Sequence, residues 1–253
     1  SIMSEDYYYV DKSLLIKDIL DSNPHGVYLF TRPRRFGKTT NLSMLDAFFN
    51  IEYKGNNWFD GLAISDYPEY ERYKNAFPVI KLNLKETKSE TYGSFVNKMK
   101  TAVCHVYEDY EYLTKSDLFD KHIKEKYSKT LTRDVDEDLL LDSIPTLCKM
   151  LKRYHSVNPI ILIDEYDRVV SDSFGEESHR KIMDYLGSFL SPILKNNDNV
   201  QMAYVTGVMQ IAKESIFSGL NNLTINNVFS IGSDERFGFT EAEIKDLFAY
   251  YGH

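Results

Sequence analysis

The sequence has little cysteine and no long hydrophobic run. Its two cysteines, Cys104 and Cys148, lie far apart in segments with helical spacing. This excludes a disulfide framework and a cysteine-based zinc cluster, so we expect a reducing compartment, the cytoplasm. The apolar runs are only about as long as a buried strand, and no charged segment followed by an apolar one opens the chain. We therefore expect neither a membrane contact nor a signal peptide.

Positively charged residues are fewer than negatively charged ones. The 30 lysines and arginines are outnumbered by 38 aspartates and glutamates, which gives a formal net charge of -8. This balance argues against attraction of the whole surface to nucleic acid or anionic lipid, so any contact with DNA must use a local basic strip. The six histidines follow no H-E-x-x-H or H-x-E spacing, which makes a metal site built from protein side chains improbable.

Apolar and aromatic residues are abundant by contrast. Hydrophobic residues make up 43% of the 253 residues, and 19 tyrosines and 15 phenylalanines contribute to them. The chain is long enough to bury a substantial core, and its length fits one large α/β domain or one such domain with a small appendage.

Five short apolar runs predict strands, and helical spacing of apolar residues predicts helices between them. The strands are expected at 27–30, 77–84, 159–167, 200–207 and, more weakly, 226–232. The helices are expected at 14–20, 40–49 and 92–107, within the charged stretch 108–138, and around 140–151 and 182–190. Alternating strands and helices predict a parallel sheet with right-handed crossovers, and such sheets bind ligands at the carboxyl ends of their strands.

The segment "TRPRRFGKTTNLSML" joins the first predicted strand to the helix that follows it. Gly37, Lys38 and Thr39 complete the phosphate-binding pattern G-x-x-x-x-G-K-[ST], but Arg32 stands where the pattern has its first glycine. Arg32 cannot adopt a positive φ as readily as glycine, so we expect the fixed φ of Pro33 to shape the turn. The alternative is a basic helix N-terminus that imitates the pattern by chance.

A loop between a buried strand and a helix N-terminus directs unpaired backbone N–H groups and the helix dipole into one concavity. On this interpretation Lys38 reaches the β and γ phosphates, Thr39 binds Mg²⁺, and Gly37 leaves room for the phosphate oxygens. For Arg34 and Arg35, solvation or pairing with nearby acids is an equally good interpretation. The residues expected to contact the phosphates are Arg34, Arg35, Phe36, Gly37, Lys38, Thr39 and Thr40.

A carboxylate pair ends the third predicted strand. We expect Asp164 to hold Mg²⁺ and Glu165 to orient and polarise an attacking water, as nucleotide hydrolysis requires. An isolated Asp-Glu pair is usually a solvated strand end, but this one follows a suitable strand after a plausible loop. Thr206, which ends the fourth strand, is expected to contact the γ phosphate or the water, although threonine is an ordinary strand residue. Asn83 could hold Glu165 in an inactive conformation until a partner binds, but its position favours the interpretation that it is an ordinary asparagine at a strand end.

Six segments in order along nearly the whole chain resemble the bacterial AAA-ATPase-like proteins, which often carry a C-terminal PD-(D/E)XK nuclease-like domain. These segments are "YVDKSLLI", "RPRRFGKTTNLSML", "WFDGLAI", "ILIDEYD", "TGV" and "FGFTEAEI". In that family an arginine commonly occupies the position of Arg32. The missing glycine therefore resembles a family trait and not a broken site.

The resemblance implies a P-loop NTPase fold, a three-layer α/β sandwich with a central, mostly parallel sheet. An additional strand would lie between the loop strand and the Asp-Glu strand. Mg-ATP is the implied ligand, with Lys38, Thr39, Asp164 and Glu165 in the roles given above. We expect residues 1–232 to form the ATPase core and 233–253 to begin a helical lid or linker, ahead of a nuclease-like domain. Self-association and contact with DNA stay open.

The leading functional hypothesis is ATP hydrolysis that drives or gates a conformational change in an attached or partner effector, for which a nuclease is one candidate. One alternative is a nucleotide-gated module that binds another protein and hydrolyses ATP negligibly. Another is a small-molecule kinase, although no acceptor site is visible and Glu165 favours water as the nucleophile. Residues 7–13 are a guess for the contact with adenine, and Arg236 is a weak candidate for charge stabilisation.

Overall fold

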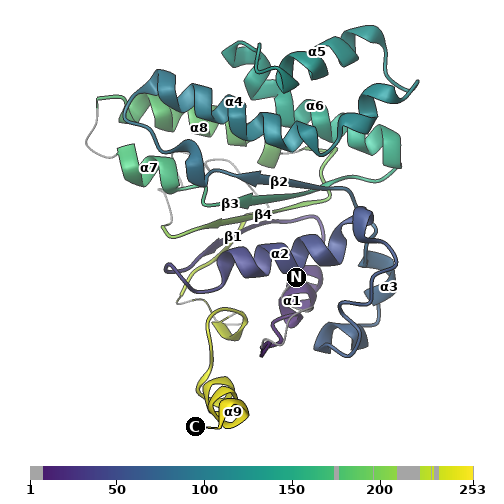
Figure 1. The fold of residues 1–253 in the computed structure, drawn as a ribbon, viewed down its shortest axis with the longest axis vertical. Coiled ribbons are helices and arrows are strands. Elements are labelled where there is room, and N and C mark those ends of the chain that lie inside the picture. The colour runs from purple at the N-terminus through teal and green to yellow at the C-terminus, as the bar shows by residue number, and fades with distance from the viewer. Residues whose placement is uncertain are drawn as a thin grey trace.

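A five-stranded parallel sheet forms the centre of the protein (Figure 1). The structure is a computed structural model and describes residues 8–173, 177–195, 197–209, 223–228, 230 and 234–252. In spatial order the strands are β2 (Val79–Asn83), β3 (Ile160–Asp164), β4 (Met202–Gly207), β1 (Val27–Thr31) and β5 (Leu223–Asn226). The parallel pairing is confirmed, and β4 is the additional strand between β1 and β3.

Helices cover both faces of the sheet, which gives the expected three layers (Figure 1). One face carries α1 (Leu14–Ser22), α2 (Lys38–Phe49) and α3 (Tyr70–Tyr73). The other face carries α4 (Tyr92–Glu108), α6 (Glu137–His155), α7 (Arg168–Ser173) and α8 (His179–Leu194), with α5 (Lys121–Leu131) packed on the outside of α4. Helix α9 (Glu241–Tyr251) extends away from the sandwich.

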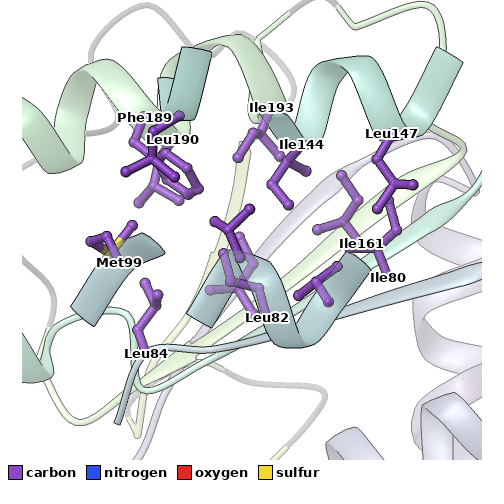
Figure 2. Close-up of a cluster of buried hydrophobic side chains, with 14 of the residues drawn as sticks. Ile80, Leu82, Leu84, Met99, Ile144, Leu147, Ile161, Phe189, Leu190 and Ile193 are labelled. Carbon is purple, nitrogen blue, oxygen red and sulfur yellow. The ribbon is translucent and has the colours of Figure 1, made fainter. Parts of the chain in front are cut away.

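All residues of β1, β3 and β4 are buried because each face of the sheet meets a layer of helices. In β1, Val27 and Leu29 belong to the core shared with α4, α6 and α8, whereas Tyr28 and Phe30 belong to the core shared with α1 and α2. Figure 2 shows the first of these cores, where side chains of β2 and β3 meet those of the covering helices. Its labelled residues are Ile80, Leu82, Leu84, Met99, Ile144, Leu147, Ile161, Phe189, Leu190 and Ile193.

The ends of two predicted strands have identifiable physical reasons. In the third segment, 159–167, the strand ends at Asp164, where the predicted carboxylate pair begins, because Glu165 has a φ of 52° and the chain turns there. The fifth was expected at 226–232, but β5 ends at Asn226. It is followed by a turn in which Ser230 donates its backbone N–H to the carbonyl of Asn227. Asparagine and serine favour such turns. Residues 229, 231 and 232 of that prediction lie outside the described residues.

The charged stretch 108–138 is helical in part. It forms a short 3-10 turn, Glu111–Lys115, and then α5, whose N-cap Asp120 accepts a hydrogen bond from the backbone of Ile123. Within the described ranges, no helix has the length and the apolar character that a bilayer crossing requires.

Candidate functional site

The loop between β1 and α2 turns through two residues with left-handed backbone conformation. These are Arg35, with a φ of 68°, and Gly37, with a φ of 76°. Gly37 is also the N-cap of α2 and has no side chain to cap the first N–H groups of the helix. No atom lies within 4 Å of a Cβ added at Gly37, so its conformation, and not crowding, is what requires glycine in this structure.

Arg32 is not among the described residues with positive φ, so the position of the missing glycine needs no glycine here. Its side chain is 2% exposed. The guanidinium donates to the carbonyl oxygens of Thr31 and Asn226 at 2.9 and 3.0 Å and also to the side chain of Asn226, and it lies 4.6 Å from the ring centre of Phe237. Arg32 therefore ties the start of the loop to β5.

Lys38 begins α2 and is 7% exposed. Its ammonium donates to the carbonyl oxygens of Arg32 and Pro33, both at 2.9 Å. Burial lowers the pKa of Lys38 below its ordinary value of 10.5, although Asp164, Asp167 and Glu165 act in the opposite direction. An anion beside Lys38 would stabilise the buried positive charge further.

Asp164 is the point at which the loop and two strands meet. Thr39 donates its hydroxyl to Asp164 Oδ2 at 2.8 Å, and Thr206 donates its hydroxyl to Asp164 Oδ1 at 2.5 Å. The backbone N–H of Glu165 also donates to Oδ1, at 3.0 Å. The structure thus brings together three residues that the sequence predicted for the site from three separate segments.

Thr206 and Asp164 are buried, at 0% and 4% exposed. The hydroxyl of Thr206 has a partner in Asp164, and its expected contact with a phosphate or a water stays a prediction. Asn83 accepts a hydrogen bond from the backbone N–H of Lys85, which is the behaviour of an ordinary asparagine at a strand end. Arg236 donates to Asp18 at 2.8 Å, so its charge is already paired.

A cavity of about 630 Å³ lies over the loop, within the size range of small-molecule sites. All seven residues predicted to contact phosphate line it, as does Glu165. The rest of its lining comes from both ends of the chain and from the start of α2: Tyr8, Tyr9, Val10, Lys12, Asn41, Arg236, Gly238 and Phe239.

The C-terminal part of this wall is fastened to the loop by hydrogen bonds. Asn41 of α2 donates its side-chain amide to the carbonyl of Arg236 at 2.8 Å, and Gly238 donates its backbone N–H to the carbonyl of Phe36 at 3.3 Å. Lys12 donates to the carbonyl of Glu235 at 2.7 Å and pairs with the carboxylate of Glu243 at 2.6 Å. Reasoning from the sequence suggested residues 7–13 and Arg236, most of which contribute to this wall, but it missed Gly238, Phe239 and the bonds that join the wall to the loop.

The described part of the chain contains no group of three or more His, Cys, Asp or Glu side chains arranged to hold a metal ion. In the predicted metal site, the side-chain oxygens of Thr39 and Asp164 lie side by side and could both bind one ion. Two protein donors suit an ion such as Mg²⁺, which usually keeps several waters and shares phosphate oxygens with a substrate.

A sequence model of the family described as "Predicted AAA-ATPase" matches residues 1–217. The chain belongs to this AAA-ATPase-like family. Membership agrees with the order of the strands and with the loop between β1 and α2. It supports a nucleotide-binding P-loop for ATP.

A curated relative is an uncharacterized protein encoded in the vnfD 5' region of Azotobacter chroococcum mcd 1. It is 28% identical to this chain over an alignment 260 positions long, which covers 97% of this chain. The chain spans 42% of the length of that relative.

Proposed function

We propose that this member of the AAA-ATPase-like family binds Mg-ATP in the cavity over the loop and hydrolyses it. The observation that carries the proposal is the convergence of Thr39 and Thr206 on Asp164, next to a buried Lys38 and at the carboxyl ends of β1, β3 and β4. In parallel α/β sheets this edge is where ligands bind.

The loop supplies the phosphate contacts in this proposal. Lys38 exchanges its two carbonyl partners for phosphate oxygens, and the backbone N–H groups of the loop and of the first turn of α2 surround the phosphates. Arg34 and Arg35 are exposed at the cavity and add positive charge there. Phe36, Gly37 and Thr40 line the same space.

Thr39 and Asp164 are the residues that would hold Mg²⁺, through the two oxygens that now share a hydrogen bond. When bound, the ion would neutralise phosphate charge and favour attack at the γ phosphate. Glu165 orients the attacking water and accepts its proton, since it lines the cavity directly after Asp164.

Part of the cavity lining suits a purine. Four residues far from the phosphate loop in sequence line the same cavity with apolar and aromatic surface: Tyr8, Tyr9, Val10 and Phe239. Most of the segment guessed for adenine, residues 8–13, is described, and three of its residues besides Lys12 line this wall. Tyr7 lies outside the described residues.

Helix α9 is the element through which we propose that the site acts on an effector. It has no buried residue, and it exposes four large apolar side chains: Ile244, Phe248, Tyr250 and Tyr251. Lys12 on the cavity wall pairs with Glu243 of this helix. The same exposed face favours the second candidate function, a nucleotide-gated module that binds another protein without appreciable hydrolysis. A nuclease-like domain, DNA contact, self-association and a boundary at residue 232 stay predictions.

Calorimetric titration of ATP in the presence of Mg²⁺ tests the proposal. We expect the wild type to bind and Lys38→Ala to bind about 10- to 100-fold more weakly, because a charged donor to the phosphates is lost. Lys121→Ala is the matched control, since this lysine is 92% exposed on α5. Equal binding by Lys38→Ala would refute the loop as the site, and phosphate release no faster than in Lys38→Ala would refute hydrolysis.

A further inference from the structure

Asp167 was not among the residues that the sequence singled out, yet it is one of the most tightly held carboxylates beside the site. Its side chain is 2% exposed. Asp167 Oδ2 accepts hydrogen bonds from the backbone N–H groups of Val208 at 2.9 Å and Met209 at 2.7 Å. Charged acceptors form stronger bonds with backbone N–H groups than neutral ones do. Asp167 thus links the turn after β3 to the segment after β4.

Tyr166 strengthens the same link. Its backbone N–H donates to the carbonyl of Thr206 at 3.1 Å, and its hydroxyl donates to the carbonyl of Met209 at 2.9 Å. The two segments approach so closely that a Cβ on Gly207 would lie 2.6 Å from Asp167 Oδ1 and 2.6 Å from Tyr166 Cε1. Only glycine at position 207 allows this approach.

Glu165 lies between two attachments to the end of β4. On one side, Asp164 accepts the hydroxyl of Thr206, and on the other side Tyr166 and Asp167 bond to residues 206–209. Glu165 itself has a φ of 52°, a conformation that a residue with a side chain keeps when its surroundings impose it. These hydrogen bonds therefore fix the backbone at Glu165 and with it the direction of the Glu165 side chain.

We propose that Asp167 is a positioning residue for the reaction: it holds the Glu165 turn against the end of β4, so that the Glu165 carboxylate faces the cavity. This inference rests on the proposed hydrolysis. A general base must stay within hydrogen-bond reach of the water that it activates, so a loosened turn affects turnover more than it affects ATP binding.

Two substitutions at Asp167 separate positioning from charge. Asp167→Ala removes both hydrogen bonds, and we expect kcat to fall about tenfold or more with KM nearly unchanged. Asp167→Asn keeps an acceptor oxygen for both N–H groups, and we expect it to restore kcat to within about threefold of the wild type. Amide hydrogen exchange at Val208 and Met209 should accelerate in the alanine variant and not in the asparagine variant.

Tyr166→Phe provides a milder test if Asp167→Ala does not fold. It removes only the hydroxyl bond to Met209 and keeps the buried ring, so we expect a smaller fall in kcat at unchanged KM. Asp136→Ala is the matched control. Asp136 is the exposed N-cap of α6 and accepts the backbone N–H of Leu139 at 2.8 Å, so its loss should lower the melting temperature and leave kcat alone.

The outcomes distinguish this inference from the proposed function. A wild type no faster than Lys38→Ala would remove the hydrolysis and this inference with it. An active wild type with equal kcat in Asp167→Ala would overturn the positioning role alone. A fall in kcat as large in Asp167→Asn as in Asp167→Ala would also overturn it, because the charge and not the held turn would then be what matters.

Discussion

The two halves of the phosphate loop use arginine in opposite ways. Arg32, in the first half, is buried and bonded to β5, and it stands where the common pattern has glycine without adopting a positive φ. Arg35, in the second half, is exposed, lines the cavity and has a φ of 68°. The first half of the loop is therefore fixed by its side chain, whereas the second half is held in a strained conformation beside the ligand space.

The loop between β1 and α2 thus turns without the first glycine of the common pattern, because its positive φ values fall at Arg35 and Gly37. The backbone strain of the loop lies at Arg35 and not at Arg32. The side chain of Arg32 instead anchors the loop to β5. The same substitution, arginine to glycine, should therefore have opposite effects on stability in the two halves.

Arg32→Gly should have the larger effect. It restores the common pattern but removes the hydrogen bonds to Thr31 and Asn226 and the contact with Phe237. We expect the free energy of unfolding to fall by about 3 kcal/mol, because charged hydrogen bonds are lost and their buried partners are left unpaired. Urea denaturation measures this. A variant as stable as the wild type would show that the anchor is not needed.

Arg35→Gly should change stability in the other direction. Glycine adopts positive φ without strain, so we expect a gain of about 0.5 to 1 kcal/mol in the free energy of unfolding. The loss of a guanidinium at the cavity should weaken ATP binding at the same time, by about tenfold or less. Arg34→Gly is the control for the lost charge, because Arg34 lies in the same exposed half and lacks a positive φ. Lower stability in Arg35→Gly would contradict the assignment of strain.

The ion pair between Lys12 and Glu243, which attaches α9 to the cavity wall, should contribute less to stability than the features of Arg32 and Arg35 do. Its contribution should also depend on pH. Burial alone would raise the pKa of Glu243, but hydrogen bonds from Lys12 and Thr240 outweigh it and hold the pKa below its ordinary value of 4.5. A depressed carboxyl pKa stabilises the folded state above that value, and this contribution is lost as the pH falls through the folded pKa, below 4.5.

We therefore expect α9 to loosen selectively in mild acid. The protection of the amides of residues 241–251 against hydrogen exchange, relative to the intrinsic exchange rate at each pH, should fall below pH 4.5 in the wild type. Glu243→Gln should show the lower protection already at neutral pH. The effect on global stability should stay below about 1 kcal/mol, as for other partly exposed ion pairs. Protection in α9 that is independent of pH would argue against a role for the pair.

Much of the fold, and the meeting of the candidate site residues at one edge of the sheet, could be predicted from the sequence. Apolar runs at β1 to β4 and helical spacing between them indicate the sheet, and the positions of Lys38, Thr39, Asp164 and Thr206 follow from strand ends that meet at one edge. The edge strand β5 was placed too late because its burial pattern is mixed and its pairing depends on β1.

Other features depend on contacts that no local pattern contains. Lys12 and Glu243 are 231 residues apart, so their ion pair could not be read from either segment. The partners of Asp167 are backbone N–H groups, which every residue but proline offers. Arg35 and Glu165 adopt left-handed conformations although neither is a glycine, so the sequence does not indicate these conformations.

The most direct test of the account is turnover and ATP affinity measured together on Glu165→Gln, with Glu241→Gln on the exposed surface of α9 as the matched control. We expect Glu165→Gln to bind Mg-ATP within about threefold of the wild type and to lose about 100-fold or more in kcat, because the general base is neutralised while the phosphate loop is intact. Appreciable turnover equal to that of the wild type would contradict the assignment of Glu165. Negligible turnover in both proteins, with ATP binding unchanged, would leave the nucleotide-gated binding module as the better description.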